Sequence, residues 1–177
     1  AEPLVHLRRV GEGLGVERRR ERCNELAGTG MLALRGGRCA VAGCARPLAA
    51  MAREYSGCEV WEQDFLALQL PAGCFDGIFA NASLFHIPSQ ELPRVLAELH
   101  ATLKPDGVLF SSNPRGNNEE GWSGGRYGAY HELDAWRAFL GQAAFVELEH
   151  YYRPAGLPLE QQPWLASVWR KRPLTGS

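Results

Sequence analysis

The feature that most restricts the fold is a strand–helix–strand pattern in the middle of the chain. FDGIFAN at residues 75–81 and GVLFSSN at residues 107–113 are typical of buried strands, and the segment between them has helical periodicity. Two strands joined through a helix lie side by side in parallel. The pattern therefore predicts a parallel sheet covered by a helix at residues 89–103, whose apolar face carries Leu92, Val95, Leu96, Leu99 and Leu103.

The flanking segments extend this alternation. RCAVAG and CEVWEQ, at residues 38–43 and 58–63, are expected strands, with a helix between them that Pro47 opens. After a further helix at residues 131–140, the last two strands are too close together for a helical crossover and should pair antiparallel. We therefore expect an α/β fold with a mostly parallel central sheet, helices on both faces and an antiparallel C-terminal hairpin formed by residues 145–152 and 164–170.

Composition limits the classes of partner. The chain has 177 residues, 45% hydrophobic and 22% charged, which suits one domain at residues 23–177 after a helical or irregular segment at residues 1–22. A net charge of −1 gives no reason to expect nucleic acid as a partner. No stretch is apolar enough to span a membrane, and no signal peptide is recognised. Five irregularly spaced cysteines favour a reducing, cytoplasmic compartment and no metal site.

Ligands of such sheets bind beyond the carboxyl ends of the strands. Upstream, ELAGTG at residues 25–30 places Gly28 and Gly30 in a turn, where the backbone can approach a ligand closely. The residues that directly follow the expected strands are the other candidates for a site: Asp64 and Phe65, then Asn81, Ala82 and Ser83, then Asn113, Pro114 and Arg115.

The order of short motifs over residues 62–113 resembles the core of class I S-adenosylmethionine-dependent methyltransferases. The stretch reads EQDFLALQLPAGCFDGIFANASLFHIPSQELPRVLAELHATLKPDGVLFSSN. Members of that family carry an acidic residue and phenylalanine after one strand, FD-x-I/V before the next, and a leucine-rich helix followed by LKPGG. The similarity, which extends over about residues 23–170, is closest to small single-domain bacterial members. It implies a Rossmann-like methyltransferase fold and methyl transfer from S-adenosylmethionine to a small molecule, with S-adenosylhomocysteine as product.

The resemblance also implies which residues meet the cofactor. The glycines of the family's first motif line the methionine part, the acidic residue and phenylalanine meet the adenine, and the end of the fourth strand flanks the sulfonium. Asp106 stands where LKPGG has a glycine, a change that a turn tolerates. The cofactor contacts implied in this way are Glu25, Gly28, Gly30, Asp64, Phe65, Asn81 and Ala82.

Two departures from the family pattern keep alternatives open. ELAGTG is shorter than the family's acidic-x-G-x-G-x-G, and no Asp or Glu lies between Glu25 and Glu54, where the family has a carboxylate for the ribose hydroxyls. Losing those charge-assisted hydrogen bonds would weaken cofactor binding by roughly one to two orders of magnitude. The second hypothesis is therefore a degenerate, catalytically weak domain used for binding or dimerisation. The third, based on G-T-G and the α/β pattern, is an NAD-dependent oxidoreductase.

The acceptor side offers one candidate base and several candidate contacts. Methyl transfer needs alignment of the reactants, and a base only where the acceptor loses a proton. His86 is the candidate base, and the alternative is that it caps a backbone group before the helix that begins at Ser89. The glycine-rich residues 114–130 are expected to form either a lid over the acceptor or a mobile loop. We expect His100 and His150 at the surface, and a homodimer is compatible with the sequence. The candidate substrate contacts are Ser83, Arg115, Arg126 and Tyr130.

Overall fold

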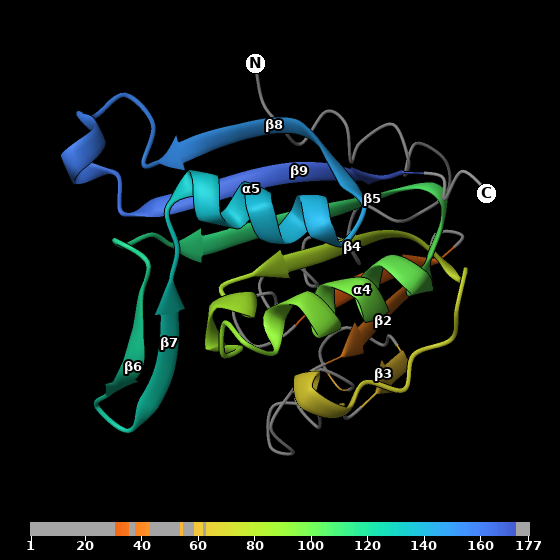
Figure 1. The fold of residues 1–177 in the computed structure, drawn as a ribbon. Helices are drawn as coiled ribbons and strands as arrows, with labels where there is room; N and C mark the ends of the chain where they lie inside the picture. The colour runs from red at the N-terminus through yellow and green to blue at the C-terminus, as the bar shows by residue number, and fades with distance from the viewer. Residues whose placement is uncertain (1–30, 36–37, 43–53, 55–58, 62, 173–177) are drawn as a thin grey trace.

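A computed structural model describes residues 31–35, 38–42, 54, 59–61 and 63–172 (Figure 1). Seven strands form one sheet in the order β3-β2-β1-β4-β5-β9-β8, and β6 and β7 form a separate hairpin. The strands are β1 (Met31–Arg35), β2 (Arg38–Ala42), β3 (Glu59–Trp61), β4 (Phe75–Asn81), β5 (Leu103–Pro114), β6 (Glu119–Ser123), β7 (Arg126–Tyr130), β8 (Phe145–Arg153) and β9 (Trp164–Lys171). The helices are η1 (Phe65–Ala67), η2 (Leu84–His86), α4 (Leu92–Thr102), α5 (Leu133–Gln142) and η3 (Leu159–Gln161).

The strand directions agree with the expected fold class except at β1. β2, β3, β4, β5 and β8 run in one direction, and β9 runs antiparallel to both of its neighbours, as predicted for the C-terminal hairpin. The sequence analysis expected no strand at Met31–Arg35, yet β1 pairs antiparallel with both β2 and β4. Two residues separate β1 from β2, too few for a parallel crossover. Met31 lies opposite Ala80, so the chain enters β1 at the carboxyl end of β4.

The helix predicted between the two central strands supplies most of the main core. It begins at Leu92 rather than at residue 89, with Pro93 in its first turn, where no backbone hydrogen bond is lost. Its apolar face packs on Ile78 and Leu109, and each side chain buried in this way contributes about 1.5–3 kcal/mol. Both described long helices, α4 and α5, cover the same face of the sheet (Figure 1). The pattern that predicted this face is confirmed, since five of its residues are fully buried: Leu92, Val95, Leu96, Leu99 and Leu103.

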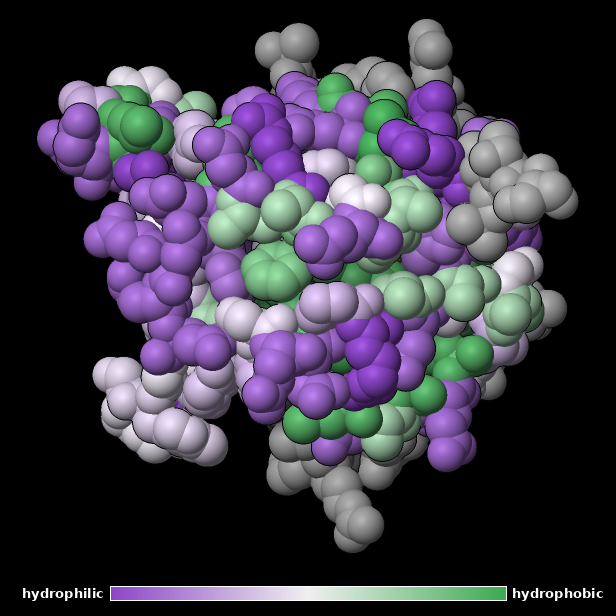
Figure 2. Space-filling view, in the orientation of Figure 1, coloured by the Kyte–Doolittle hydropathy of each residue, from purple (hydrophilic) through white to green (hydrophobic). Residues whose placement is uncertain are grey.

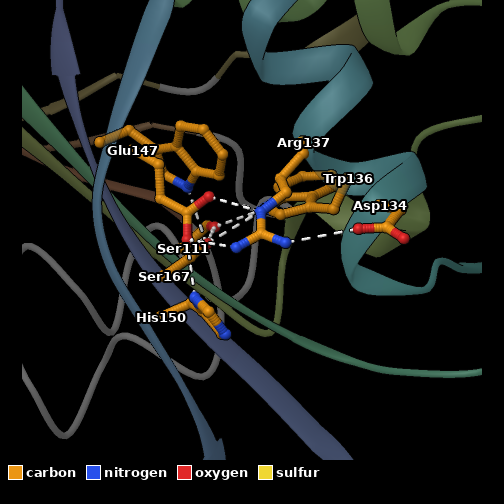
Figure 3. A network of polar contacts seen from close by, with 8 residues as sticks. Ser111, Asp134, Trp136, Arg137, Glu147, His150 and Ser167 are labelled. Atoms are coloured by element: carbon orange, nitrogen blue, oxygen red, sulfur yellow. Dashed lines mark hydrogen bonds and ion pairs between the residues drawn. The ribbon is translucent and has the colours of Figure 1, made fainter.

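A buried polar node fixes α5 to the sheet (Figure 3). The indole Nε1 of Trp136 donates to the hydroxyls of Ser111 on β5 and Ser167 on β9, at 3.2 Å each. The two hydroxyls lie 3.0 Å apart, and Trp169 donates to Ser167 at 2.8 Å. Because buried hydroxyls without partners are costly, this node sets the register of α5 on the strands below it.

A second network lies farther toward the sheet edge in the same view. Arg137 of α5 forms a two-point contact with Glu147 of β8, at 2.6 and 3.1 Å (Figure 3). Arg137, and to a lesser degree His150, hold the pKa of the Glu147 carboxyl below its usual value. His150 Nδ1 lies 2.6 Å from Glu147 and is half-buried, so its expected surface position is only partly correct. The pair joins the last helix to the edge strand.

The prediction that His100 lies at the surface is wrong. Its ring is 6% exposed, packs edge-on against Phe145 and leaves Nε2 without a hydrogen-bond partner. The reason is the position of Lys171, whose ammonium donates to the backbone oxygens of His100 and Leu103 and so caps the end of α4. Burial, followed by the charge of Lys171, lowers the pKa of His100.

The KPDG turn forms a bulge inside β5. Phe75 pairs with Leu103 and Gly77 with Val108, so residues 104–107 bulge out opposite a single residue of β4. Asp106 has φ +61°, in the left-handed region that favours glycine. The motif LKPGG has a glycine at this position. A Cβ added to Gly107 would lie 2.9 Å from the carbonyl oxygen of Lys104.

Substitutions at this bulge should change stability in opposite directions. We expect Asp106→Gly to raise the free energy of unfolding by about 0.5–1 kcal/mol, because it relieves the left-handed strain at a smaller entropic cost. Gly107→Ala, its matched neighbour, should lower it by about 1–3 kcal/mol through the clash with Lys104. Urea denaturation of the three proteins checks this. A stabilised Gly107→Ala variant would contradict the described bulge.

The stability of the fold should fall as the pH drops below the ordinary histidine value. Because the pKa of His100 is lowered in the folded protein, the unfolded chain takes up a proton on this ring at a higher pH, about 6.5. The free energy of unfolding therefore begins to fall at that pH. It stops falling once the pH is below the lower pKa of the folded protein. We expect His100→Phe to reduce the change in denaturation midpoint between about pH 7.5 and about pH 5.5. Urea titrations at both values measure it. An equal change in the variant and the parent would show that His100 does not contribute.

Candidate active site at the carboxyl edge of the sheet

The carboxyl ends of β4, β5 and β8 meet at one edge, beside the β6–β7 hairpin (Figure 1). Asn81 ends β4 in register with Ser112 of β5, and the backbone N–H of Ala82 still donates to the oxygen of Ser112 at 2.8 Å. Ala82 then takes φ +51°, a conformation that non-glycine residues rarely adopt and that often marks functional sites. This turn directs the chain out of the sheet into η2.

Two buried polar atoms at this edge have no hydrogen-bond partner. Ser83 is 4% exposed and Asn113 is 8% exposed, and neither the Ser83 Oγ nor the Asn113 Oδ1 is bonded. Unpaired buried polar atoms cost free energy in the empty protein, so they mark a place where a ligand can supply the missing contact. Asn113 opens onto a narrow crevice whose other lining residues are Phe85, Ala129, His131, Trp136 and Leu165.

The glycine-rich residues 114–130 contain the β6–β7 hairpin. The sequence predicted a lid or a mobile loop there and no strands. Gly124 and Gly125 have positive φ, as a two-residue hairpin turn requires. All of β6 is exposed, so the segment has no alternation of apolar and polar residues from which strands could be predicted. Its tip stands clear of the body at the lower left of Figure 2, and Trp122 there is 76% exposed. The hairpin forms one wall of an open notch at the carboxyl edge.

Hydrogen bonds to the backbone attach the hairpin to the segments that precede α4 and α5. Glu120 of β6 accepts from the N–H of Ser89 at 2.9 Å, and the side chain of Asn118 accepts from the N–H of Glu132 at 2.9 Å. Hydrogen bonding by Ser89, assisted by Tyr127, holds the pKa of the Glu120 carboxyl below its usual value. The hairpin is therefore fixed at its base, next to the start of α4.

The position of His86 defines which of its nitrogens is basic. Its Nδ1 lies 2.7 Å from the backbone oxygen of Tyr127 on β7. A carbonyl oxygen only accepts, so Nδ1 carries a proton, and in the neutral ring Nε2 keeps its lone pair. The ring is exposed and lies 3.9 Å, centroid to centroid, from that of Phe85. The backbone group that His86 contacts belongs to β7, and neither η2 nor α4 has a side-chain cap from His86.

His131 belongs to the structural part of the site. Its ring stacks near Trp136 and Phe139, and its Nε2 lies 3.5 Å from the hydroxyl of Ser89. Burial lowers the pKa of His131, and the nearby Glu120 offsets part of that effect. A neutral ring at neutral pH fits its place between the hairpin and α5.

Asp64 and Phe65 lie at the same edge, farther along the sheet. Asp64 accepts from the N–H of Leu66 at 2.9 Å and so caps η1, while Phe65 packs against the main core. Arg94 of α4 donates to the backbone oxygen of Leu66 at 3.0 Å, which ties this loop to the helix. β3 and β4 are separated by β2 and β1, so their axes lie about 14 Å apart, which is three strand spacings.

The candidate substrate residues are dispersed rather than gathered. Arg115 donates to the backbone oxygens of Gln162 and Leu159, at 3.0 and 2.6 Å, and so holds the loop between β8 and β9. Arg126 is exposed at the hairpin turn. The ring of Tyr130 lies 6.0 Å from that of Phe85 and packs over Gly128, where an added Cβ would lie 2.6 Å from its hydroxyl.

Sequence reasoning missed Arg153 and Glu120. The Arg153 guanidinium, at the end of β8, donates through Nη2 to the hydroxyl of Ser112 and to Asn81 Oδ1, the latter at 3.4 Å. Neither residue belongs to a local motif, since their partners are 31 to 72 positions away. Glu25, Gly28 and Gly30 lie outside the described residues. Within the described part of the chain, no group of three or more His, Cys, Asp and Glu is placed to hold a metal ion, and no helix is long and apolar enough to cross a membrane.

Comparisons with known proteins agree with this architecture. Residues 26–111 match the family model described as a methyltransferase domain. No curated protein sequence matches the chain. The structure is similar to an S-adenosylmethionine-dependent methyltransferase from Mesorhizobium loti, with a TM-score of 0.62 and 16% identity, over 75% of this chain and 79% of that one.

Two further solved structures show how broad this fold is. The 1,6-didemethyltoxoflavin-N1-methyltransferase of Burkholderia thailandensis, solved with S-adenosylhomocysteine and its substrate, has a TM-score of 0.61 and 19% identity, with 76% of this chain and 61% of that one covered. The [4+2]-cyclase SpnF has a TM-score of 0.58 and 17% identity, with 75% and 65% covered. At these identities the likeness establishes the fold alone, and one of the two structures is a cyclase.

The attachment of the hairpin should depend on Glu120. We expect Glu120→Gln to speed amide hydrogen exchange in β6 and β7 a few-fold, because the charge-assisted contact with Ser89 becomes a weaker neutral one. Glu119→Gln is the matched control, since Glu119 bonds only to the N–H of Asn117 within the same loop. Exchange measured by mass spectrometry separates the two. Equal rates in both variants would show that Glu120 does not attach the hairpin.

Proposed function

We propose that this chain, whose residues 26–111 match the methyltransferase domain model and whose fold is that of class I S-adenosylmethionine-dependent methyltransferases, transfers a methyl group to a small-molecule acceptor. The acceptor binds at the carboxyl edge, between the end of β4 and the hairpin. The strongest support is the meeting of His86, with a free Nε2, and the unpaired Ser83 and Asn113 at that edge.

The described residues fit S-adenosylmethionine as the cofactor. β3, which precedes Asp64, and β4, which ends at Asn81, lie about 14 Å apart, a separation comparable to the length of an extended nucleoside that carries an amino acid. Asp64 uses Oδ1 for the η1 cap and keeps its second carboxylate oxygen for an amino group such as that of adenine. The positive φ of Ala82 turns the chain away from the space above β4. Phe65, packed in the core, offers its backbone and ring edge.

The residues around the acceptor mainly align it and accept its proton. The cofactor, when bound, supplies a methyl group that its sulfonium already activates. Nε2 of His86 takes the proton of an acceptor that must lose one, while the Tyr127 oxygen keeps the ring in the correct tautomer. Ser83 and Asn113 orient polar groups of the acceptor, and Tyr130 and Phe85 enclose its apolar part. Arg115, occupied by two carbonyl oxygens, positions the neighbouring loop rather than the acceptor.

One observation favours the alternative of a degenerate domain. β1, the strand that follows the glycine-containing residues 25–30 in the sequence, runs antiparallel to β4 and begins at this edge. Together with the absence of an acidic residue between Glu25 and Glu54, this favours weak cofactor binding. The affinity for S-adenosylhomocysteine, the product formed from the cofactor, distinguishes the methyltransferase from the degenerate domain.

Calorimetric titration with S-adenosylhomocysteine tests the cofactor. We expect binding in the micromolar range and a loss of about 10-fold in Asp64→Ala, because the variant lacks the carboxylate that meets the adenine. Asp134→Ala is the control, since Asp134 is 94% exposed at the start of α5. An undetectable interaction at millimolar ligand would rule out the methyltransferase and leave the degenerate domain.

Transfer of labelled methyl groups tests the base. With a panel of small acceptors that carry an ionisable N–H or O–H, we expect His86→Gln to reduce kcat by about 10²–10⁴-fold. Its affinity for S-adenosylhomocysteine should stay unchanged. A variant that keeps the parent's kcat would assign His86 to the structure of η2 only.

A further inference from the structure

Arg153 presents unused hydrogen-bond donors at the carboxyl edge. Only Nη2 of its guanidinium has acceptors, namely Ser112 and Asn81. Its Nε is buried and has no partner, and Nη1 has none among the described residues. A guanidinium carries five N–H donors in a rigid fork, and leaving several of them unmatched in a half-buried position is unfavourable. The arrangement is therefore incomplete in the protein alone.

The charge of Arg153 is not neutralised by a described carboxylate. The acidic partners of the described ion pairs are Glu91, Glu98, Asp76, Asp134 and Glu147, and each binds another residue. The guanidinium carbon lies 5.8 Å from the centre of the Trp164 ring, and Glu149 and Arg153 both act on the nearby Tyr151 without forming an ion pair with each other. An aromatic platform and two neutral acceptors hold the fork in place while leaving its charge available.

Arg153 lies on the face of the sheet opposite α4 and α5. Ser112 alternates along β5 with Ser111 and Asn113, which point to the helix side, and Arg153 pairs in register with Trp164 of β9. Its contact with Asn81 brings it to the end of β4, within the proposed site. The group therefore reaches a ligand at the carboxyl edge from the other side than His86.

We propose that Arg153, supported by Asn81, Ser112 and Trp164, binds the carboxylate of a molecule held at this edge, an inference that rests on the proposed function. The planar fork matches a carboxylate in two-point contact, and no described residue satisfies it. Two sources of this chemistry reach the edge: the amino-acid carboxylate of the cofactor and a carboxylate on the acceptor.

Two measurements on the full chain distinguish these sources. The first is calorimetric affinity for S-adenosylhomocysteine and for 5′-methylthioadenosine, which lacks the amino-acid carboxylate. The second is the rise in Tm on adding benzoate, compared with chloride at equal ionic strength. The variants are Arg153→Gln, which keeps amide donors without charge, and Arg153→Lys, which keeps the charge without the fork. Arg170→Gln is the matched control, an exposed arginine of β9 at the opposite edge of the sheet.

A carboxylate site predicts one of two results. If the cofactor supplies the carboxylate, Arg153→Gln weakens S-adenosylhomocysteine binding by about 10- to 100-fold and changes 5′-methylthioadenosine binding less than about twofold. If the acceptor supplies it, both affinities stay as in the parent and the benzoate-dependent rise in Tm is lost. In either case Arg153→Lys is intermediate, and it replaces Arg153→Gln if that variant does not fold.

The opposite result is equally defined. If the Arg153 variants behave like Arg170→Gln in both measurements, the proposal is overturned and Arg153 only ties β8 to β4 and β5. A parent protein that binds neither nucleoside contradicts the proposed function. The benzoate measurement then still decides whether Arg153 binds carboxylates.

Discussion

The rest of the structure depends on the buried polar residues at the carboxyl end of β5. Residues 107–113 are all buried, and the last three are Ser111, Ser112 and Asn113. Polar groups in such a position require partners, which come from both faces of the sheet. Trp136 and Ser167 satisfy Ser111 on the helix side, and this fixes α5. Arg153 satisfies Ser112 on the other side, while Asn113 keeps its side-chain oxygen open to the crevice under the hairpin.

The site is built on this strand end and completed by segments that carry little hydrophobic surface. The hairpin is attached through Glu120, Asn118 and the contact between His86 and Tyr127. Such attachment orients the proposed base, His86, and leaves the hairpin tip free, with Trp122 of β6 exposed. A rigid sheet edge with a lightly attached wall suits a site that must admit an acceptor and release a product.

The fold and the reaction are separate conclusions here. Relatives of the same architecture include a methyltransferase solved with S-adenosylhomocysteine and a cyclase. What separates such functions is the chemistry at the carboxyl edge, where this chain combines Asp64, His86 and an uncompensated Arg153. The antiparallel direction of β1 is the described departure from the parallel order, and it lies directly beside β4, the most family-like strand.

The sequence by itself determined the central β4–α4–β5 unit, because its periodicity and its motif order are local properties of residues 62–113. It also predicted which residues follow each strand, including His86 and Asn81. Tertiary structure alone decided the rest. The direction of β1, the burial of His100 under Lys171 and the hairpin at Glu119–Tyr130 depend on partners distant in sequence or on exposed strands without an apolar pattern. Arg153 reaches Asn81 across 72 positions, and no local signal in the sequence encodes that contact.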